Sequence, residues 1–533
     1  MAKLPPIPTI ADAERTPLVE ALLGVITALL GVITALQEEN HRLREQVDLL
    51  KAEVARLKGH KGKPKIRPSS LEKKNPKRKK RGKKNRDRSN RLEIEAKPVI
   101  VQAPDVPEGS RFKGYSDFMV QELVIEARAT CYRLEKWQTP DGQVITAPLP
   151  HDAHGHFGPT LMSFVLYQYY HAQVTEPLIA EQLREWGVEI GTGQVHRILV
   201  EGKDKFHDEK DAILEIGLRV SRYIHVDDTG ARHQGQNGVC THIGNDAFAW
   251  FASTESKSRI NFLSLLRAGH TDYVLSGEAL EYMAAQNMPK SVLKSLAPAQ
   301  GGCFADDKAW QDALRKWGIR KALHVRIATE GALLGSVLHH GIHPDLAIVS
   351  DDAGQFNVLL HALCWIHAER NLAKLLGFND QQRKALDDVR SKLWRLYRDL
   401  KAFKRRPREE LKSVLSRRFD ALCDTKTCFV TLNNALKRMK KNKPELLLVL
   451  ERPDLPLHNN LSEGDIREYV KKRKISGPTR SHAGRRCRDT FASLKKTCRK
   501  NAISFWNFLL DRIRGDNQIP PLPAIIEARA QPP

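Results

Sequence analysis

The feature that most limits how this chain can fold is a short apolar run that ends in two carboxylates, YIHVDDTGARH at 223–233. Its first residues are mostly aromatic, β-branched or apolar, which predicts a buried strand. Asp227 and Asp228 stand where this strand ends. Adjacent acids at such a place either cap a turn or hold a divalent metal ion, and other parts of the chain must distinguish the two.

Two later stretches have matching chemistry. LAIVSDDA at 346–353 is a second apolar run that ends in paired acids, Asp351 and Asp352. Glu463 falls within 461–474, for which the pattern of apolar and charged residues predicts a helix. One acid pair alone would favour ordinary turn acids, whereas the order aspartate, aspartate, glutamate along the chain favours a metal site.

We therefore predict that Asp227, Asp351 and Glu463 are the catalytic and metal-binding residues, with Asp228 and Asp352 as alternates. Mg²⁺ binds carboxylates together with waters and substrate phosphates, so no His or Cys ligand is required. We expect two Mg²⁺ ions, which Mn²⁺ can replace. Two such ions about 4 Å apart stabilise the attacking and leaving oxygens when a phosphodiester is cleaved.

Residues 216–514 are predicted to form an α/β, RNase H-like catalytic core with helical insertions. Strands are expected at 223–228, within 239–254 around an Asn-Asp turn, at 271–276, at 346–352 and, after a helix, at 361–367. Helices are expected at 308–318, from about 371 to 449, at 461–474 and at 503–514. The Pro-rich residues 515–533 are expected to be a tail without chemistry.

The N-terminal region, 15–58, carries a heptad repeat that predicts a parallel, two-stranded leucine zipper. The alternative is a membrane segment, since residues 21–36 carry no charge. Sixteen residues fall short of the roughly 20 that span a bilayer, so we expect a homodimer or higher homo-oligomer and no membrane partner. The dimerisation residues are Leu22, Leu29, Leu36, Leu43, Leu50 and Leu57, and the polar Asn40 fixes the register.

Residues 59–95 are predicted to be a flexible basic arm. The stretch 58–91 holds 17 Lys or Arg and two acids, and it supplies most of the formal net charge of +24. Such an arm follows phosphates without reading bases, so nucleic acid is the expected partner. A solvated linker and a nuclear-import signal are the alternatives. The DNA-binding residues predicted here are Lys77, Arg78, Lys79, Lys80, Arg81, Lys83 and Lys84.

Two small regions are expected between the arm and the core. Residues 96–155 should form a small β-containing module with a Pro-Asp-Gly turn. Residues 156–215 should be helical, with a pair of short helices in 177–202 that is similar to a helix-turn-helix. Gln194 and Arg197 would then face DNA, although such helix pairs are as common in plain packing.

Three ordered motifs give these residues a family context. They are DDTGARH at 227–233, CWIHAER at 364–370 and HNNLSEGDIRE at 458–468, the last followed by KKRK at 471–474. Together with the zipper, they resemble the signatures of the insertion-sequence sixty-six family of bacterial DDE transposases. The resemblance covers most of the chain, and it assigns the family's three acids to Asp227, Asp351 and Glu463.

This resemblance implies a DNA transposase of an insertion sequence. Such a protein binds the terminal inverted repeats of its element and carries out metal-dependent strand cleavage and strand transfer into target DNA, with or without accessory proteins encoded by the element. It implies a cytoplasmic, nucleoid-associated location, and the absence of any CxxC pair fits a reducing compartment. Trp365 and His367 match the second motif, and Arg473 and Lys474 after the third are assigned to DNA binding.

The chain also departs from the family pattern. Asp228 stands where the family has Glu, His458 where it has Asp, and Gly464 where it has Arg. The Cys-rich finger that the family carries after its zipper is missing. An alternative from another class is a non-catalytic DNA-binding protein derived from a transposase. A third hypothesis is an enzyme of this fold that only hydrolyses nucleic acid.

Overall fold

A computed structural model describes residues 15–57, 99–116, 118, 120, 122–149 and 155–531. They fall into two units, Met1–Met119 and Val120–Pro533, and each unit is described by itself. The basic arm at 59–95, and with it the DNA contacts predicted from Lys77 to Lys84, lies outside the described residues.

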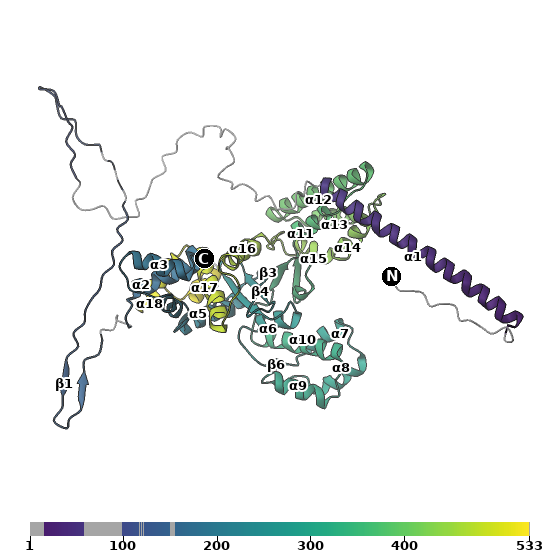
Figure 1. Cartoon of the computed structure of the whole chain (residues 1–533), viewed down its shortest axis with the longest axis horizontal. Coiled ribbons are helices and arrows are strands. Elements are labelled where there is room, and N and C mark those ends of the chain that lie inside the picture. Colours follow the sequence, from purple (N-terminus) through teal and green to yellow (C-terminus); the bar gives the residue numbers. More distant parts are fainter. Residues whose placement is uncertain are drawn as a thin grey trace. The chain divides into compact units, whose positions relative to one another are not determined.

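The first unit contains one long helix, α1 (Pro17–Leu57), which confirms the helix expected at 15–58 (Figure 1). Its apolar side chains are exposed, as shown by Leu22, Leu29 and Leu36, each more than half accessible. The segment Pro17–Leu36 is also long and apolar enough to cross a membrane, by length and composition. The pairing of two such helices stays a prediction, and the side chains of Asn40, Leu43, Leu50 and Leu57 are outside the described part of the chain.

The small module contains one hairpin. β1 (Lys136–Gln138) pairs antiparallel with β2 (Val144–Thr146) across the predicted Pro-Asp-Gly turn. The strand-like run before it, 122–134, forms no strand in the structure. None of the described side chains from 122 to 149 is buried, so this hairpin brings no core of its own.

A five-stranded sheet organises the second unit, with the order β5-β4-β3-β8-β9. The central strand β3 pairs antiparallel with β4, which pairs antiparallel with β5; on its other side β3 pairs parallel with β8, and β8 with β9. The strands are β3 (Tyr223–Gly230), β4 (Val239–Gly244), β5 (Ala249–Thr254), β8 (Ala347–Ser350) and β9 (Leu360–Leu363). Since β3 and β8 are parallel neighbours, both acid pairs come to the same end of the sheet.

Three details of the predicted core are wrong. The strand expected at 361–367 ends at Leu363, because a helix begins at Trp365. Residues 271–276 do not join the main sheet, because only Tyr273–Val274 (β6) is extended and it pairs with Cys303–Phe304 (β7) in a separate two-stranded sheet. The chain between β8 and β9 contains a single 3₁₀ turn, η4 (Gly354–Phe356), in place of the expected helix. The connection has only nine residues, 351–359, and it returns the chain so that β9 pairs parallel with β8.

Helices surround this sheet in groups that follow the chain (Figure 1). Before β3 lie α2 (Pro159–Leu166), the π-helix η2 (Tyr167–Ala172), α3 (Glu176–Glu185), α4 (Thr192–Val200) and α5 (Asp204–Val220). The first insertion, between β5 and β8, holds α6 (Arg259–Leu266), α7 (Gly277–Ala285), α8 (Lys290–Leu296), α9 (Asp307–Lys316) and α10 (Ala322–His339). The second follows α11 (Trp365–Ala373) and holds α12 (Asp380–Arg405), α13 (Glu409–Cys423), α14 (Val430–Lys441) and α15 (Lys443–Leu446). The chain then forms α16 (Asn460–Ser476), α17 (His482–Lys500), α18 (Phe505–Arg514) and α19 (Leu522–Ala530).

The two faces of the sheet have different cores because side chains alternate along each strand. Ile224 and Val226 of β3 join the large core, which also contains side chains of α2 to α5, α10 and α18. Cys240 and Phe251 face the other way and pack against Tyr469 of α16. The second insertion has a core of its own.

The large core extends across two of the predicted domain limits. The predicted limit between residues 215 and 216 falls inside α5, whose Ile213, Leu214 and Leu218 are buried in that core. The expected tail instead forms α19, which packs on α5 through the buried Leu522 and Ile526. The expectation that 515–533 is only a tail is therefore wrong for this segment. LPAIIEARA forms a helix with two apolar residues on one face.

The edge of the sheet formed by β5 is covered by a helix. β5 is an edge strand, and its outward backbone N–H groups at Ala249, Phe251 and Ser253 donate hydrogen bonds to side chains of α17. The acceptors are Thr497 Oγ1 (3.1 Å), Ser493 Oγ (2.9 Å) and Asp489 Oδ2 (2.8 Å), which are spaced four residues apart. Four residues of helix rise about 6 Å and two residues of strand about 6.8 Å, so the two ladders stay in step. The contact protects the edge from pairing with another chain.

Candidate active site

One asparagine joins the three sequence motifs. Asn459, immediately before α16, is fully buried, and its Nδ2 donates to the Val226 carbonyl of β3 at 2.7 Å. Its Oδ1 lies 2.9 Å from Nδ1 of His225, and its backbone N–H donates to Cys364 Sγ at the start of α11 at 3.2 Å. Moving any of these partners away would leave a buried polar group unpaired, which costs free energy. The Asn459 contacts therefore hold the neighbouring segments in place. The first turn of α16 is thereby held against β3 and α11.

Asp227 lies on the same face of β3 as His225, since the two are separated by one residue. Burial is the main cause that raises its pKa, to about 7. The negative charges of Asp351, Asp228 and Glu463 raise it further, while the hydrogen bond donated by the Asp228 backbone N–H (2.8 Å) opposes the rise. Asp351 and Glu463 are therefore close enough to Asp227 for their charges to act on it.

The alternate acids are already engaged elsewhere. Asp228 pairs with Lys257 and accepts a hydrogen bond from Gln355 Nε2 at 2.7 Å. Asp352 pairs with Arg438 and accepts from Asn442 Nδ2 at 3.1 Å.

The preferred acids have fewer partners than the alternates. Among the described residues, the Asp351 carboxylate accepts only from the backbone N–H of Ala353 (3.1 Å), and neither Asp227 nor Asp351 has a cationic partner there. Asp227 and Asp351 thus keep free oxygens, which agrees with the choice made from the sequence, although that choice stays a prediction.

Glu463 differs from the other two acids because it is held by a cation. Arg370 of α11 donates from Nη1 to Oε1 (2.8 Å) and from Nη2 to Oε2 (3.3 Å). His367 Nε2 lies 3.6 Å from the same Oε1, and Arg467 Nη2 lies 3.9 Å from Oε2. Arg370 was not identified from the sequence, although it closes the CWIHAER motif, and that position was its only signal.

The donor set suits a hard divalent cation. All three acids offer oxygens, and two of them lack a counter-charge, which is the chemistry that Mg²⁺ prefers. As they stand, no three His, Cys, Asp or Glu side chains among the described residues are arranged to hold a metal ion. The chemistry of the three acids fits such a metal, while their arrangement in this structure does not form its site.

The other predicted site residues have various positions. Trp365 is buried in the core of the second insertion, where its Nε1 donates to the Leu446 carbonyl at 2.8 Å, so it has a packing role beside the site. Gln194 caps α4 by accepting from the Gly191 N–H at 2.7 Å, while Arg197 is exposed. Arg473 donates to the Gly230 carbonyl at the end of β3, and Lys474 is exposed.

A basic surface of α12 extends toward the segment before α16. It consists of Lys392, Arg395, Arg398, Lys401 and Arg405, which are all exposed and make no ion pair within the described part of the chain. At 100° per residue, the three arginines point away from the buried Leu393, Leu396 and Leu400. Burial mainly lowers the pKa of His458, and the charge of Lys401 lowers it further while that of Glu463 opposes this. The basic surface of α12 therefore extends close to the segment that carries Glu463.

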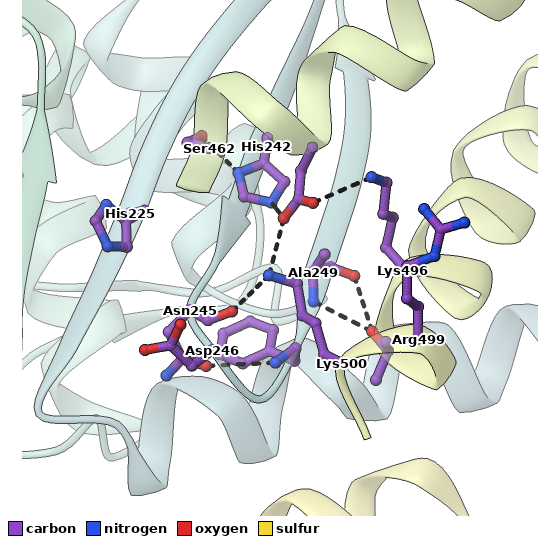
Figure 2. Close-up of polar contacts among 12 residues, drawn as sticks. His225, His242, Asn245, Asp246, Ala249, Ser462, Lys496, Arg499 and Lys500 are labelled. Carbon is purple, nitrogen blue, oxygen red and sulfur yellow. Dashed lines mark hydrogen bonds and ion pairs between the residues drawn. The ribbon is translucent and has the colours of Figure 1, made fainter. Parts of the chain in front are cut away.

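A second group of charges lies between α16 and α17 and is called here the lysine network. Asp465 lies 2.9 Å from Lys500, 3.3 Å from Lys496 and 3.2 Å from Nε2 of His242. Glu468 lies 3.1 Å from both Lys495 and Lys496, and 2.7 Å from Arg499. Figure 2 shows His242 beside Ser462, and His242 Nδ1 lies 2.6 Å from Ser462 Oγ. The same view shows Lys496 and Lys500 extending from α17 toward α16. This network fastens the helix that carries Glu463 to the sheet.

Comparison with known proteins gives the class. Residues 348–486 match the family described as Transposase IS66 family, a range that contains Asp351, the CWIHAER motif and Glu463 but not Asp227. The chain is also 44% identical over 323 residues to the uncharacterized protein y4jO of Sinorhizobium fredii (strain NBRC 101917 / NGR234), which covers 60% of this chain and all of the relative. The chain belongs to the IS66 transposase family. It is therefore a nucleic-acid-processing enzyme by class.

Proposed function

We propose that the protein is a DDE transposase that cuts the ends of an insertion sequence and joins them to target DNA. The observation that carries this is the grouping of Asp351 and Glu463 around Asp227, since β3 and β8 are parallel neighbours and the charges of both acids contribute to the raised pKa of Asp227. We also propose that the sheet is an RNase H-like core. A central strand with one antiparallel and one parallel neighbour, in the order β5-β4-β3-β8-β9, supports this.

Asp227, Asp351 and Glu463 would hold Mg²⁺. The metal would supply charge stabilisation to the oxygens of the scissile phosphodiester. The chain's own contribution is positioning, because Asn459 fixes the start of α16 against β3 and α11. The lysine network holds the following turns of α16 on the sheet.

The test of the acids compares each proposed ligand with its neighbour. Asp227→Asn, Asp351→Asn and Glu463→Gln should each lower Mg²⁺-dependent nicking and joining of a labelled element end. We expect a loss of roughly a hundredfold or more, since a bound metal stabilises the reaction by several kcal/mol. Asp228→Asn and Asp352→Asn are the matched controls and should lose less than about tenfold, because those acids are already paired.

One further measurement makes this test specific. DNA binding in Ca²⁺ should stay near wild type for all five variants, which shows that the fold and the DNA contacts persist. Wild-type cleavage by the Glu463→Gln protein would falsify the proposed triad.

The proposed substrate is DNA, and the basic surface of α12 supports a path for its phosphates toward the acids. Replacing Arg395, Arg398 and Arg405 together by Gln should weaken binding to specific and random duplexes alike. The slope of log affinity against log salt should become shallower by about 2 to 3, since each phosphate that the protein no longer neutralises accounts for about 0.9 of the slope.

The matched control for the basic surface of α12 removes the same net charge from the same insertion. It replaces Lys412, Arg418 and Lys440 by Gln; these residues pair with Glu451, Asp399 and Asp424. Their replacement should leave the salt slope within about one of wild type. Equal effects of the two triple variants would contradict a defined path.

We also propose that α1 pairs with α1 of a second copy. Its exposed leucines at seven-residue spacing support this, because they would be covered in a parallel dimer. A membrane is the competing partner for Pro17–Leu36. Sedimentation of a peptide of residues 15–58 without detergent separates the two, since a zipper gives a soluble dimer and a membrane segment gives aggregates.

A further inference from the structure

Glu463 is already neutralised in a site that has to accept a cation. Its carboxylate is only 16% exposed, and both oxygens are taken by the planar guanidinium of Arg370. A bidentate arginine contact is among the stronger hydrogen-bonded ion pairs. Asp227 and Asp351 have no such partner among the described residues. The site is therefore asymmetric, with one compensated acid and two uncompensated ones.

The asymmetry is produced by the way that α11 and α16 begin. Both helices start from the Cys364–Asn459 contact, at which the Asn459 N–H donates to the cysteine sulfur. Arg370 then lies in the second turn of α11 and Glu463 in the first turn of α16. His367, one turn before Arg370, lies 3.4 Å from Arg370 Nη1 and 3.6 Å from Glu463 Oε1. The pair therefore depends on two helix starts that a buried asparagine fixes.

A guanidinium at this place conflicts with a bound metal. Two like charges that share one carboxylate repel each other strongly in a partly buried site. Arg370 is 45% exposed, so its side chain has solvent to move into without opening the core. Both oxygens of Glu463 then become free for another cation.

We infer that Arg370 is a positioning residue that holds Glu463 in the metal-free protein and releases it when a divalent cation binds. This inference rests on the proposed function, because it takes Glu463 as a metal ligand. It makes metal binding an exchange of one cation for another at the same carboxylate. The arginine therefore sets the metal affinity of the DNA-free enzyme and keeps Glu463 in place beside Asp227 and Asp351.

The test measures binding of Mn²⁺ alone to the full-length protein without DNA, from the loss of the free-ion electron paramagnetic resonance signal. Arg370→Gln removes the competitor and should tighten Mn²⁺ binding about three- to fivefold, the upper part of the range expected for losing one partly exposed ion pair. Arg370→Lys keeps the charge and should stay near wild type. Unchanged or weaker Mn²⁺ binding by Arg370→Gln would overturn the inference.

A matched control is available on the other side of the same glutamate. Arg467 is 72% exposed and 3.9 Å from Glu463, so Arg467→Gln should leave Mn²⁺ affinity within about twofold of wild type. An effect equal to that of Arg370→Gln would mean that general charge, and not the bidentate contact, sets the affinity, and this result would also overturn the inference.

A double variant separates this inference from the proposed function. In a Glu463→Gln background, Arg370→Gln should no longer change Mn²⁺ binding, because the shared carboxylate is gone. If Glu463→Gln retains both cleavage and Mn²⁺ binding, the proposed triad fails. If Glu463→Gln loses both but Arg370→Gln binds Mn²⁺ like wild type, the triad stands and only the role of Arg370 fails. Circular dichroism spectra and melting temperatures of each variant exclude loss of folding as the cause.

Discussion

The acid site and the lysine network are both made of carboxylates at the sheet and α16, yet their charge balance is opposite. At the acid site, Asp227 and Asp351 have no cationic partner within the described residues, and burial with neighbouring acids raises the pKa of Asp227 to about 7. In the lysine network burial also acts to raise the pKa of Glu468, but Lys495 and Lys496 outweigh it and lower the pKa to about 2. The network stabilises the fold, whereas the acid site is a place where the fold tolerates repulsion.

The comparison teaches which charges the chain keeps for structure. A buried ion pair is weak evidence of stability by itself, but removing one partner leaves the others unpaired and is strongly destabilising. A crowded acid without a cation behaves in the opposite way, because neutralising it removes repulsion. Residues of one chemical type therefore give opposite responses to the same substitution.

The largest expected effect is on stability. Asp465→Asn should leave Lys496 and Lys500 without their shared partner and lower the free energy of unfolding by about 3 kcal/mol or more. Asp227→Asn should be neutral or slightly stabilising. Urea unfolding of the two variants beside wild type measures the difference, and similar midpoints for both would remove the distinction between the two regions.

Much of this arrangement could be predicted from the sequence. The strands β3 and β8 and the helix α16 are signalled by local apolar patterns, so Asp351 and Glu463 could be assigned to ends of elements without a structure. Asp227 was expected at a strand end as well, but β3 continues past it to Gly230. Their grouping was predicted from the order aspartate, aspartate, glutamate along the chain, and the parallel pairing of β3 with β8 brings the two aspartate pairs to the same end of the sheet. These inferences need only short-range information.

The missed features depend on contacts between distant residues. Arg370 and Glu463 are 93 residues apart, and no local pattern predicts that they meet. Asn459 belongs to the HNNLSEGDIRE motif, but its role becomes visible only when its partners Val226 and Cys364 are known. The lysine network is similar, because the lysines of α17 look like a solvated face in the sequence.

α17 was not predicted because its contact with the sheet is made partly by polar residues. Asp489, Ser493 and Thr497 satisfy the backbone of β5, so the helix lacks a purely apolar stripe at this face. The opposite error occurred at 271–276, where an apolar, β-rich run suggested a strand of the main sheet. Composition cannot tell which sheet a short strand joins, and β6 pairs with β7.

The smaller effect is a pH dependence, with opposite signs in the two regions. The folded pKa of Asp227 is raised from 3.8 to about 7, so the folded protein binds the extra proton between these values and stability falls as pH rises through about 4 to 7. The folded pKa of Glu468 is lowered from 4.5 to about 2, so its stabilisation is present above 4.5 and is lost as pH falls toward 2.

Two variants measured at pH 5 and pH 8 separate these contributions, since neither Asn nor Gln titrates. Relative to wild type, Asp227→Asn should gain on the order of 1–2 kcal/mol between pH 5 and pH 8, after allowance for solvent screening. Glu468→Gln should be less stable than wild type by the same amount at both values, because both lie above its titration window. If the difference in unfolding free energy between Asp227→Asn and wild type does not change with pH, Asp227 is ionised throughout. The acid site would then be as well compensated as the lysine network, and the contrast between the two regions would be wrong.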